Sequence, residues 1–412
     1  MAGTEHFPHP YADFTYFGLL LYIVLPTILL GLFGWANRHW TIATVVIVSV
    51  VQFSDLLPVF PNTPVWELWI VVGYGLLQAG LAWGLLRWRL RPLFWVFLVL
   101  SLLPLVAVKV LPVLRPGSLF GFLGISYVTF RALDVLFSIH DGVLKTLSPG
   151  TYFTYLFFWP TVSSGPVDRY RRFEKDLNRQ RSRTEFLDDF NVAVDLVFRG
   201  FLYKFIIAAL IRTYWMDRMD LHQDASHVIG YMYGYSLYLF FDFAGYSSFA
   251  IGVGRVFGIQ SPANFDLPFL ARNIRDFWNR WHISLSFWFR DHIYMRFVIA
   301  ATKGNWFKGK YTASYLGLFL TFGIMGVWHG VEPHYLIYGC YHAILLCGYD
   351  AFARWNKQAK RIPDTRGWRI ANTLITAHVV CFGLLIFSGK LGSRPVVNPP
   401  KPPPPVVAEP PK

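Results

Sequence analysis

The stretch FWNRWHISLSFWFRDHIYMRF, residues 277–297, places charged side chains among aromatic ones in a chain that is otherwise rich in apolar residues. It contains three arginines, one aspartate and two histidines. If residues 275–293 form one helix, successive side chains turn by about 100° and two faces emerge. Aromatic residues, Leu285 and His292 form an apolar arc, and the opposite side carries a polar stripe of Arg275, Asn279, His282, Ser286 and Arg290.

A charge at the centre of a bilayer costs about 2.5 kcal/mol or more, so this helix is not expected to face lipid all round. Two interpretations remain open. The helix either lies flat on the cytoplasmic surface as an amphipathic helix, or its polar stripe forms one wall of an internal passage, with His282 pointing inward. One end on the surface and the other at a cavity mouth would satisfy both.

The composition of the whole chain indicates a membrane protein. Of its 412 residues, 54% are hydrophobic and 15% are charged, whereas soluble proteins carry roughly 25% charged residues. A bilayer-spanning helix needs about 20 apolar residues. The long apolar runs are 14–34, 65–86, 93–114, 228–250, 311–328 and 368–388, and shorter or more polar runs are 40–57, 117–137, 190–214 and 334–352. We predict an all-α polytopic membrane protein with about ten to eleven transmembrane helices plus re-entrant or interfacial ones.

The domain organisation is predicted to be simple. Residues 1–390 form one membrane domain, and residues 391–412 form a proline-rich, disordered tail, because dense proline favours an extended chain without internal hydrogen bonds. The three cysteines are too scattered for a disulfide scaffold or a zinc site.

Basic residues gather in loops at 87–91, 169–183, 303–310 and 354–369. Clustered Lys and Arg in short loops mark the cytoplasmic side of a membrane protein, so the net charge of +14 is not taken to indicate nucleic-acid binding. With these four loops inside, both termini are predicted to be outside. The segment TYFTYLFFWPTVSSGPVDRYRRF (151–173) is then re-entrant, and irregular backbone at that depth predicts an interior cavity.

His329 lies in GIMGVWHGVEPHYLIYG (323–339), directly after an 18-residue apolar run. An ionisable side chain at such a place is a functional candidate by default. The alternative is a structural histidine bonded to a backbone carbonyl. His334 and His342 are close in sequence, but no recognisable ligand set accompanies them, and we predict no metal site.

Three motifs together, SSGPVDRYRRF (163–173), residues 277–297 and MGVWHGVEPHYLIYGCYHA (325–343), resemble the membrane-bound O-acyltransferase (MBOAT) family. Within it they are most similar to the branch that D-alanylates teichoic acids. The alginate O-acetylase branch looks similar around WHISLSFWFRD but continues with a proline-glycine stretch where this chain has Met295–Phe297. The resemblance implies a ring of helices around a central tunnel, in the plasma membrane of a Gram-positive bacterium.

The resemblance also implies roles for particular residues. His329 and His282 correspond to the catalytic histidines, and a neutral histidine acting as general base contributes about 10²- to 10⁴-fold to a rate. Asn279, Ser286, Arg290 and Trp328 are candidates for lining the tunnel.

The donor implied by the resemblance is D-alanine, held as a thioester on the phosphopantetheine of a cytoplasmic D-alanyl carrier protein. No cofactor is bound by the chain itself. A small membrane partner and an extracytoplasmic transfer partner would pass D-alanine on to lipoteichoic acid.

Carrier proteins are generally acidic, and Arg169, Arg171, Arg172 and Arg296 are candidates for docking one by charge. Positive-inside orientation explains the same loop charge without any partner. Two rival functions stay open: an O-acetyltransferase for a cell-wall or exported polysaccharide, and a transporter or scaffold. Transporters commonly have paired broken helices in two related halves, and the sequence shows no such pair.

Overall fold

The computed structural model describes residues 14–54, 66–114, 121–219, 224–359 and 365–392. These residues form helices and connecting loops, with one isolated antiparallel bridge, Phe265 to Trp281. The α-helices are α1 (Phe14–Leu32), α2 (Arg38–Gln52), α3 (Trp66–Trp88), α4 (Arg91–Leu114), α5 (Ile125–His140), α6 (Pro149–Leu156), α7 (Tyr170–Asn178), α8 (Arg183–Phe201), α9 (Ala209–Ile211), α10 (Asp217–Met219), α11 (Ala225–Val256), α12 (Ile274–Trp278), α13 (Ile283–Phe289), α14 (Met295–Lys303), α15 (Thr312–His329), α16 (Pro333–Ala359) and α17 (Arg366–Phe387). The 3-10 segments are η1 (Trp159–Thr161), η4 (Pro268–Leu270) and η6 (Lys390–Gly392), and the π-helical segments are η2 (Leu202–Ala208), η3 (Arg212–Met216) and η5 (Arg290–Tyr294). The all-α prediction is confirmed for the described residues.

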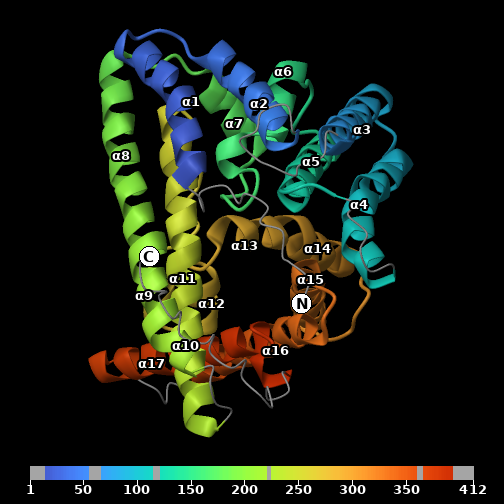
Figure 1. Ribbon diagram of the computed structural model, residues 1–412. Coiled ribbons are helices and arrows are strands. Elements are labelled where there is room, and N and C mark those ends of the chain that lie inside the picture. The colour runs from blue at the N-terminus through green and yellow to red at the C-terminus, as the bar shows by residue number, and fades with distance from the viewer. Residues whose placement is uncertain (1–13, 55–65, 115–120, 220–223, 360–364, 393–412) are drawn as a thin grey trace, which may run out of the picture.

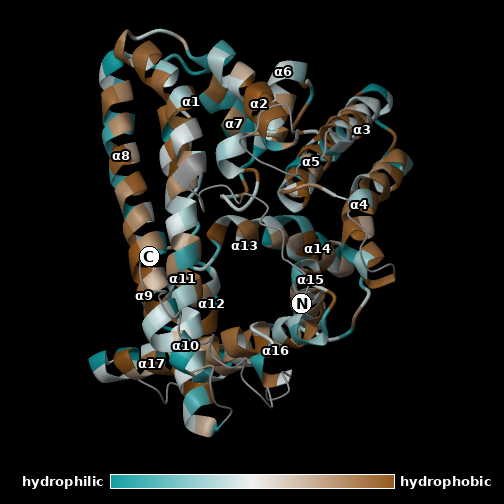
Figure 2. Ribbon diagram, viewed as in Figure 1, coloured by the Kyte–Doolittle hydropathy of each residue, from teal (hydrophilic) through white to brown (hydrophobic). Residues whose placement is uncertain are grey.

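Five described helices, α3, α4, α11, α16 and α17, are long and apolar enough to cross a bilayer. Four of them match long runs predicted from sequence, and α16 matches the weaker run 334–352. The runs 14–34 and 311–328 are helical as α1 and α15 but do not belong to these five. Figure 2 shows the apolar character most plainly along α4. The proline-rich tail lies outside the described residues from position 393 onward.

The helices fall into two groups that meet at residues 277–297 (Figure 1). Helices α3, α4 and α5 pack against one another, and α6 packs against α2, α3 and α5. The long α11 runs beside α8 and also packs against α17, which in turn contacts α16. Helices α12–α15 lie between the two groups (Figure 1), and the segment 277–297 contacts both of them: Trp288 packs on Phe130 of α5, and Trp281 packs on Phe240 of α11.

Residues 275–293 do not form one helix, so the prediction of a continuous helix is wrong. α12 ends at Trp278, α13 begins at Ile283, and η5 separates α13 from α14. The break is fixed by backbone hydrogen bonds to a neighbouring loop: Asp266 N donates to Arg280 O at 3.0 Å, and Ile283 N donates to Asn264 O at 2.9 Å. The residues of the apolar arc are nevertheless buried, including Trp281 and Leu285.

The segment 151–173 is not a continuous helix, and it is interrupted where its prolines predicted. Short α6 is followed by η1 and then by irregular backbone leading into α7. The fully buried Arg131 of α5 satisfies this backbone, because its guanidinium donates to the carbonyls of Tyr155 (2.9 Å), Leu156 (3.0 Å) and Thr161 (2.8 Å). Unpaired carbonyls of this kind are costly away from water, so Arg131 makes the interruption possible.

Candidate active site

A cavity of ≈ 80 Å³ lies among α11, α12, α13, α15, α16 and α17, and both His282 and His329 line it. We call it the histidine cavity. The two histidines are 47 positions apart in sequence, and the fold brings them to one space. The other lining residues are almost all apolar: Leu239, Phe243, Trp278, Trp281, Leu285, Met325, Tyr338, Leu384 and Phe387.

His282 occupies the break between α12 and α13 with left-handed backbone angles, φ 43° and ψ 51°. A residue with a Cβ in this conformation costs of order 1–3 kcal/mol, and such strain clusters at functional sites. A chain of hydrogen bonds holds the surrounding loop: Ser284 Oγ donates to Asn264 Oδ1 (2.6 Å), and Asn264 Nδ2 donates to Ser247 Oγ of α11 (3.1 Å). His282 is therefore held in place by segments on both sides of it.

The His282 ring is 6% exposed and stands edge-on to Phe243, with ring centroids 4.7 Å apart. Its buried Nε2 has no hydrogen-bond partner within the described residues. Burial lowers the pKa of His282 to about 3, so the ring is neutral at pH 7. An unpaired buried nitrogen facing a cavity calls for an explanation, and a bound substrate atom would supply the missing partner.

His329 is the last residue of α15. Its ring packs against Trp328 (centroids 4.5 Å apart) and edge-on against Phe387 (4.9 Å). Gly326 allows this end of α15 to approach α16 closely, because a Cβ there would lie 2.4 Å from the Tyr335 carbonyl oxygen. The backbone carbonyl of His329 also accepts a hydrogen bond from Lys109 Nζ of α4 at 3.4 Å.

Lys109 was not predicted as a site residue, although the sequence contains a signal for it. It is the only charged residue in the apolar run 93–114, and such a residue marks function by default. In the structure it places a positive charge at the C-terminal end of α15, where a cation is favourable, and so ties the first group of helices to the His329 end of the histidine cavity.

A second cavity of ≈ 330 Å³, which we call the polar cavity, lies next to the first. Trp278 and Met325 line both cavities and form the partition between them. Asn279, Ser286 and Arg290 line the polar cavity. The helix break therefore separates His282 from the stripe on which it was predicted to lie.

Two other residues near the site lie behind its walls. Trp328 was predicted to line the passage, but it is not among the residues lining either cavity and packs instead against Phe130 of α5 (centroids 5.4 Å apart). His342 of α16 is completely buried, and neither ring nitrogen has a partner within the described residues. Its ring packs against Trp278 (5.1 Å) and Tyr338 (4.6 Å), both of which line the histidine cavity.

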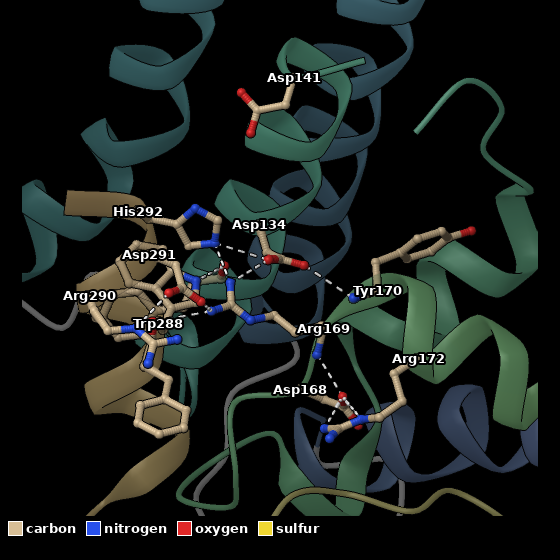
Figure 3. A network of polar contacts seen from close by, with 12 residues as sticks. Asp134, Asp141, Asp168, Arg169, Tyr170, Arg172, Trp288, Arg290, Asp291 and His292 are labelled. Atoms are coloured by element: carbon tan, nitrogen blue, oxygen red, sulfur yellow. Dashed lines mark hydrogen bonds and ion pairs between the residues drawn. The ribbon is translucent and has the colours of Figure 1, made fainter. Parts of the chain in front are cut away.

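A network of polar contacts stabilises the C-terminal end of α13 (Figure 3). Arg169 donates to Asp134 of α5 (2.7 Å) and to Asp291 of η5 (2.8 Å), and it also contacts His292. His292 bonds Asp134 at 3.0 Å and stacks on Phe137. The loop before α7, helix α5 and the segment after α13 are thereby joined by a network in which Asp134 and His292 are buried and Arg169 and Asp291 are partly exposed.

The four arginines proposed for docking differ in their surroundings. Arg172 pairs with the buried Asp168, and Arg296 pairs with Asp141, so these two and Arg169 are engaged within the chain. Arg171 is exposed. Docking by these residues stays a prediction, and Arg171 is the one whose charge is most accessible to another protein.

The structure predicts that replacing Arg169 lowers the stability of the protein more than replacing Arg171. Arg169→Leu leaves the buried Asp134 without its cation, and we expect a loss of stability on the order of 2 kcal/mol. Arg171→Leu is the matched control, with little expected change because its side chain is exposed. Thermal unfolding of the two purified variants in detergent checks this, and equal midpoints would show that the network contributes nothing.

The comparison with known proteins identifies the class of protein to which this chain belongs. The family model described as "MBOAT, membrane-bound O-acyltransferase family" matches residues 70–389, which include the whole site. The chain belongs to the membrane-bound O-acyltransferase family, and it is a membrane protein and an acyltransferase by that membership.

Individual relatives refine this class. The chain is 43% identical over 398 residues to a teichoic acid D-alanyltransferase of Bacillus subtilis (strain 168), covering 92% of this chain and 98% of that protein. It is 37% identical over 404 residues to a teichoic acid D-alanyltransferase of Lacticaseibacillus rhamnosus, covering 93% and 97%. A probable alginate O-acetylase of Pseudomonas fluorescens is 29% identical over 344 residues, covering 80% of this chain and 64% of that protein.

Proposed function

We propose that this protein transfers D-alanyl groups from a carrier-protein thioester to a hydroxyl acceptor, for D-alanylation of lipoteichoic acid. The observation that carries the proposal is the shared cavity of His282 and His329 in a chain that matches named teichoic acid D-alanyltransferases over nearly their whole length. The alginate O-acetylase relative is less similar and is covered to a smaller extent, so O-acetylation is the second candidate.

The transfer reaction needs a general base but no further activation of the acyl donor, because a thioester is already activated. The neutral imidazole of His329 accepts the proton of the attacking hydroxyl while the hydroxyl oxygen forms a bond to the thioester carbonyl carbon. The carbon–sulfur bond then breaks, and the departing pantetheine thiolate takes the proton back from His329. An O–H and a C–S bond are replaced by a C–O and an S–H bond.

We assign His282 the role of binding the acyl donor. Its Nε2, which has no hydrogen-bond partner among the described residues, can hydrogen-bond the thioester or the end of the phosphopantetheine arm. That arm arrives on the D-alanyl carrier protein and is not a resident cofactor. The polar cavity, with Asn279, Ser286 and Arg290, is the proposed approach of that arm. Movement of the Trp278 and Met325 side chains would then connect the polar cavity to the histidine cavity.

We also propose how the chain is arranged in the membrane. About ten to eleven membrane helices form a ring around the tunnel, with the basic loops on the cytoplasmic side and both termini outside, in the plasma membrane of a Gram-positive bacterium. The carrier protein then acts from the cytoplasm. An extracytoplasmic partner and a small membrane partner pass the D-alanyl group to lipoteichoic acid.

A donor comparison tests the function. Membranes from cells lacking this chain, with and without its re-expression, would receive carrier protein loaded with labelled D-alanine or, separately, labelled acetyl donors. We expect label in lipoteichoic acid only with the D-alanyl donor and only when the chain is present. Label entering a polysaccharide from the acetyl donor, with D-alanine esters unchanged, would favour O-acetylation instead.

A further inference from the structure

A third cavity, of ≈ 760 Å³, lies away from both histidines, between the start of α12 and the helices α16 and α17. We call it the basic groove. Its lining shares no residue with the histidine cavity or the polar cavity. Along α16 the lining extends from Ile344 to Lys357, a rise of roughly 20 Å at 1.5 Å per residue. The groove is therefore elongated along two helices that are apolar and long enough to span a bilayer.

Among the described residues, the polar side chains that line the basic groove are all cationic or uncharged. Arg272, Lys357 and Arg369 contribute positive charge, and the described lining includes no aspartate or glutamate. Three asparagines, Asn273, Asn356 and Asn372, add amide groups that donate hydrogen bonds. This set of side chains is suited to a phosphate group, which is anionic and accepts several hydrogen bonds at once.

The polar and apolar residues are separated along the helices. Lys357 lies near the end of α16 and Arg369 near the start of α17, so these two charges belong to the same end of an antiparallel pair. Toward the other end the lining is mostly apolar, and Ile344 and Ile375 are exposed, at 59% and 58%. Trp368 stands beside the charged end, where tryptophan is typical of the boundary between lipid tails and water.

We propose that the basic groove binds an anionic phospholipid of the surrounding leaflet. The phosphate lies at Lys357 and Arg369, at the shared end of α16 and α17, and an acyl chain follows the apolar wall past Ile375 and Ile344. Arg272 adds positive charge to the same groove from the start of α12. Basic pockets between membrane helices are suited to anionic lipid head groups. A free phosphate or a soluble anion would use the charged end only, and would leave the apolar length of the groove uncovered.

The position of the groove links the lipid to the active site. Asn273 caps the N-terminus of α12, accepting a hydrogen bond from Asp276 N at 2.9 Å. Trp278, at the other end of this short helix, belongs to the partition of the histidine cavity. A lipid held against Arg272 and Asn273 therefore contacts the start of the helix that carries the partition.

Lipid retention by the full-length protein tests the proposal. The purified chain would be depleted of lipid, given equal amounts of phosphatidylglycerol and phosphatidylcholine with the same acyl chains, and analysed by native mass spectrometry. We expect preferential retention of phosphatidylglycerol. The combined variant Arg272→Gln, Lys357→Gln, Arg369→Gln should reduce that retention about tenfold and leave phosphatidylcholine unchanged.

Two further variants separate the groove from general surface charge. Lys303→Gln, Lys308→Gln and Lys310→Gln together remove the same charge outside the groove, and retention should stay at the wild-type level. Gly348→Phe leaves every charge in place but fills the groove, where a Cβ at Gly348 meets nothing within 4 Å, and it should lose the lipid without unfolding.

Three results would overturn the proposal. The first is equal loss of phosphatidylglycerol in the Lys303, Lys308 and Lys310 control, which would mean non-specific attraction. The second is full retention in both the Gln variant of the groove and Gly348→Phe. The third is displacement of the lipid by soluble glycerol phosphate at matched concentration, which would make the site one for a free phosphate compound.

Discussion

His329→Gln is expected to reduce D-alanyl transfer by about 10²- to 10⁴-fold, the usual contribution of a general base. Glutamine keeps a polar side chain of similar length at the end of α15 but does not accept the proton of an attacking hydroxyl at neutral pH. The backbone carbonyl that receives the Lys109 hydrogen bond is unchanged by this substitution. Abundance in the membrane and thermal stability should therefore stay close to those of the wild-type protein.

The measurement is the rate at which labelled D-alanine leaves the carrier protein and enters lipoteichoic acid in membranes containing each variant. His334→Gln is the matched control, since His334 is near in sequence and packs on Tyr335 but does not line the histidine cavity. The control should retain its activity. A fully active His329→Gln protein would remove the base from the mechanism and favour a transport or scaffolding role.

The sequence predicted the helical membrane class and identified the apolar arc of residues 277–297, because both depend on local apolar pattern. It also singled out the two histidines, since ionisable residues in apolar segments are rare and chemically distinctive. It had no means of identifying Phe243, Tyr338 or Phe387 as walls of the cavity. Those residues are apolar side chains in apolar helices, and only the tertiary packing distinguishes them from their neighbours.

The break at His282 was missed for a similar reason. The run 275–293 contains no proline or glycine, so its local preference is a continuous helix. The interruption comes from the loop around Asn264, whose backbone and side chain bond Ile283 and Ser284. Tertiary hydrogen bonds override local helix preference here, and the resulting left-handed residue is one of the two candidate catalytic histidines.

The left-handed backbone of His282 makes glycine its most informative replacement. At φ 43° an alanine retains the steric cost of a Cβ, on the order of 1 kcal/mol, whereas a glycine has none. His282→Gly should therefore unfold at a temperature equal to or above that of His282→Ala. Both should lose most D-alanyl transfer, since each removes the ring that faces the donor.

The glycine variant also leaves space beside a cavity of ≈ 80 Å³, and added imidazole should restore part of its activity.

Because burial lowers the pKa of His282 to about 3, the ring stays neutral from about pH 5 to pH 9 and loses function only as the pH falls toward 3. The ratio of wild-type to variant rate should then be constant across that range. A ratio that changes steeply near pH 6.5 would show that His282 titrates like an exposed histidine, and a glycine variant with unchanged transfer would show that the ring does not touch the donor.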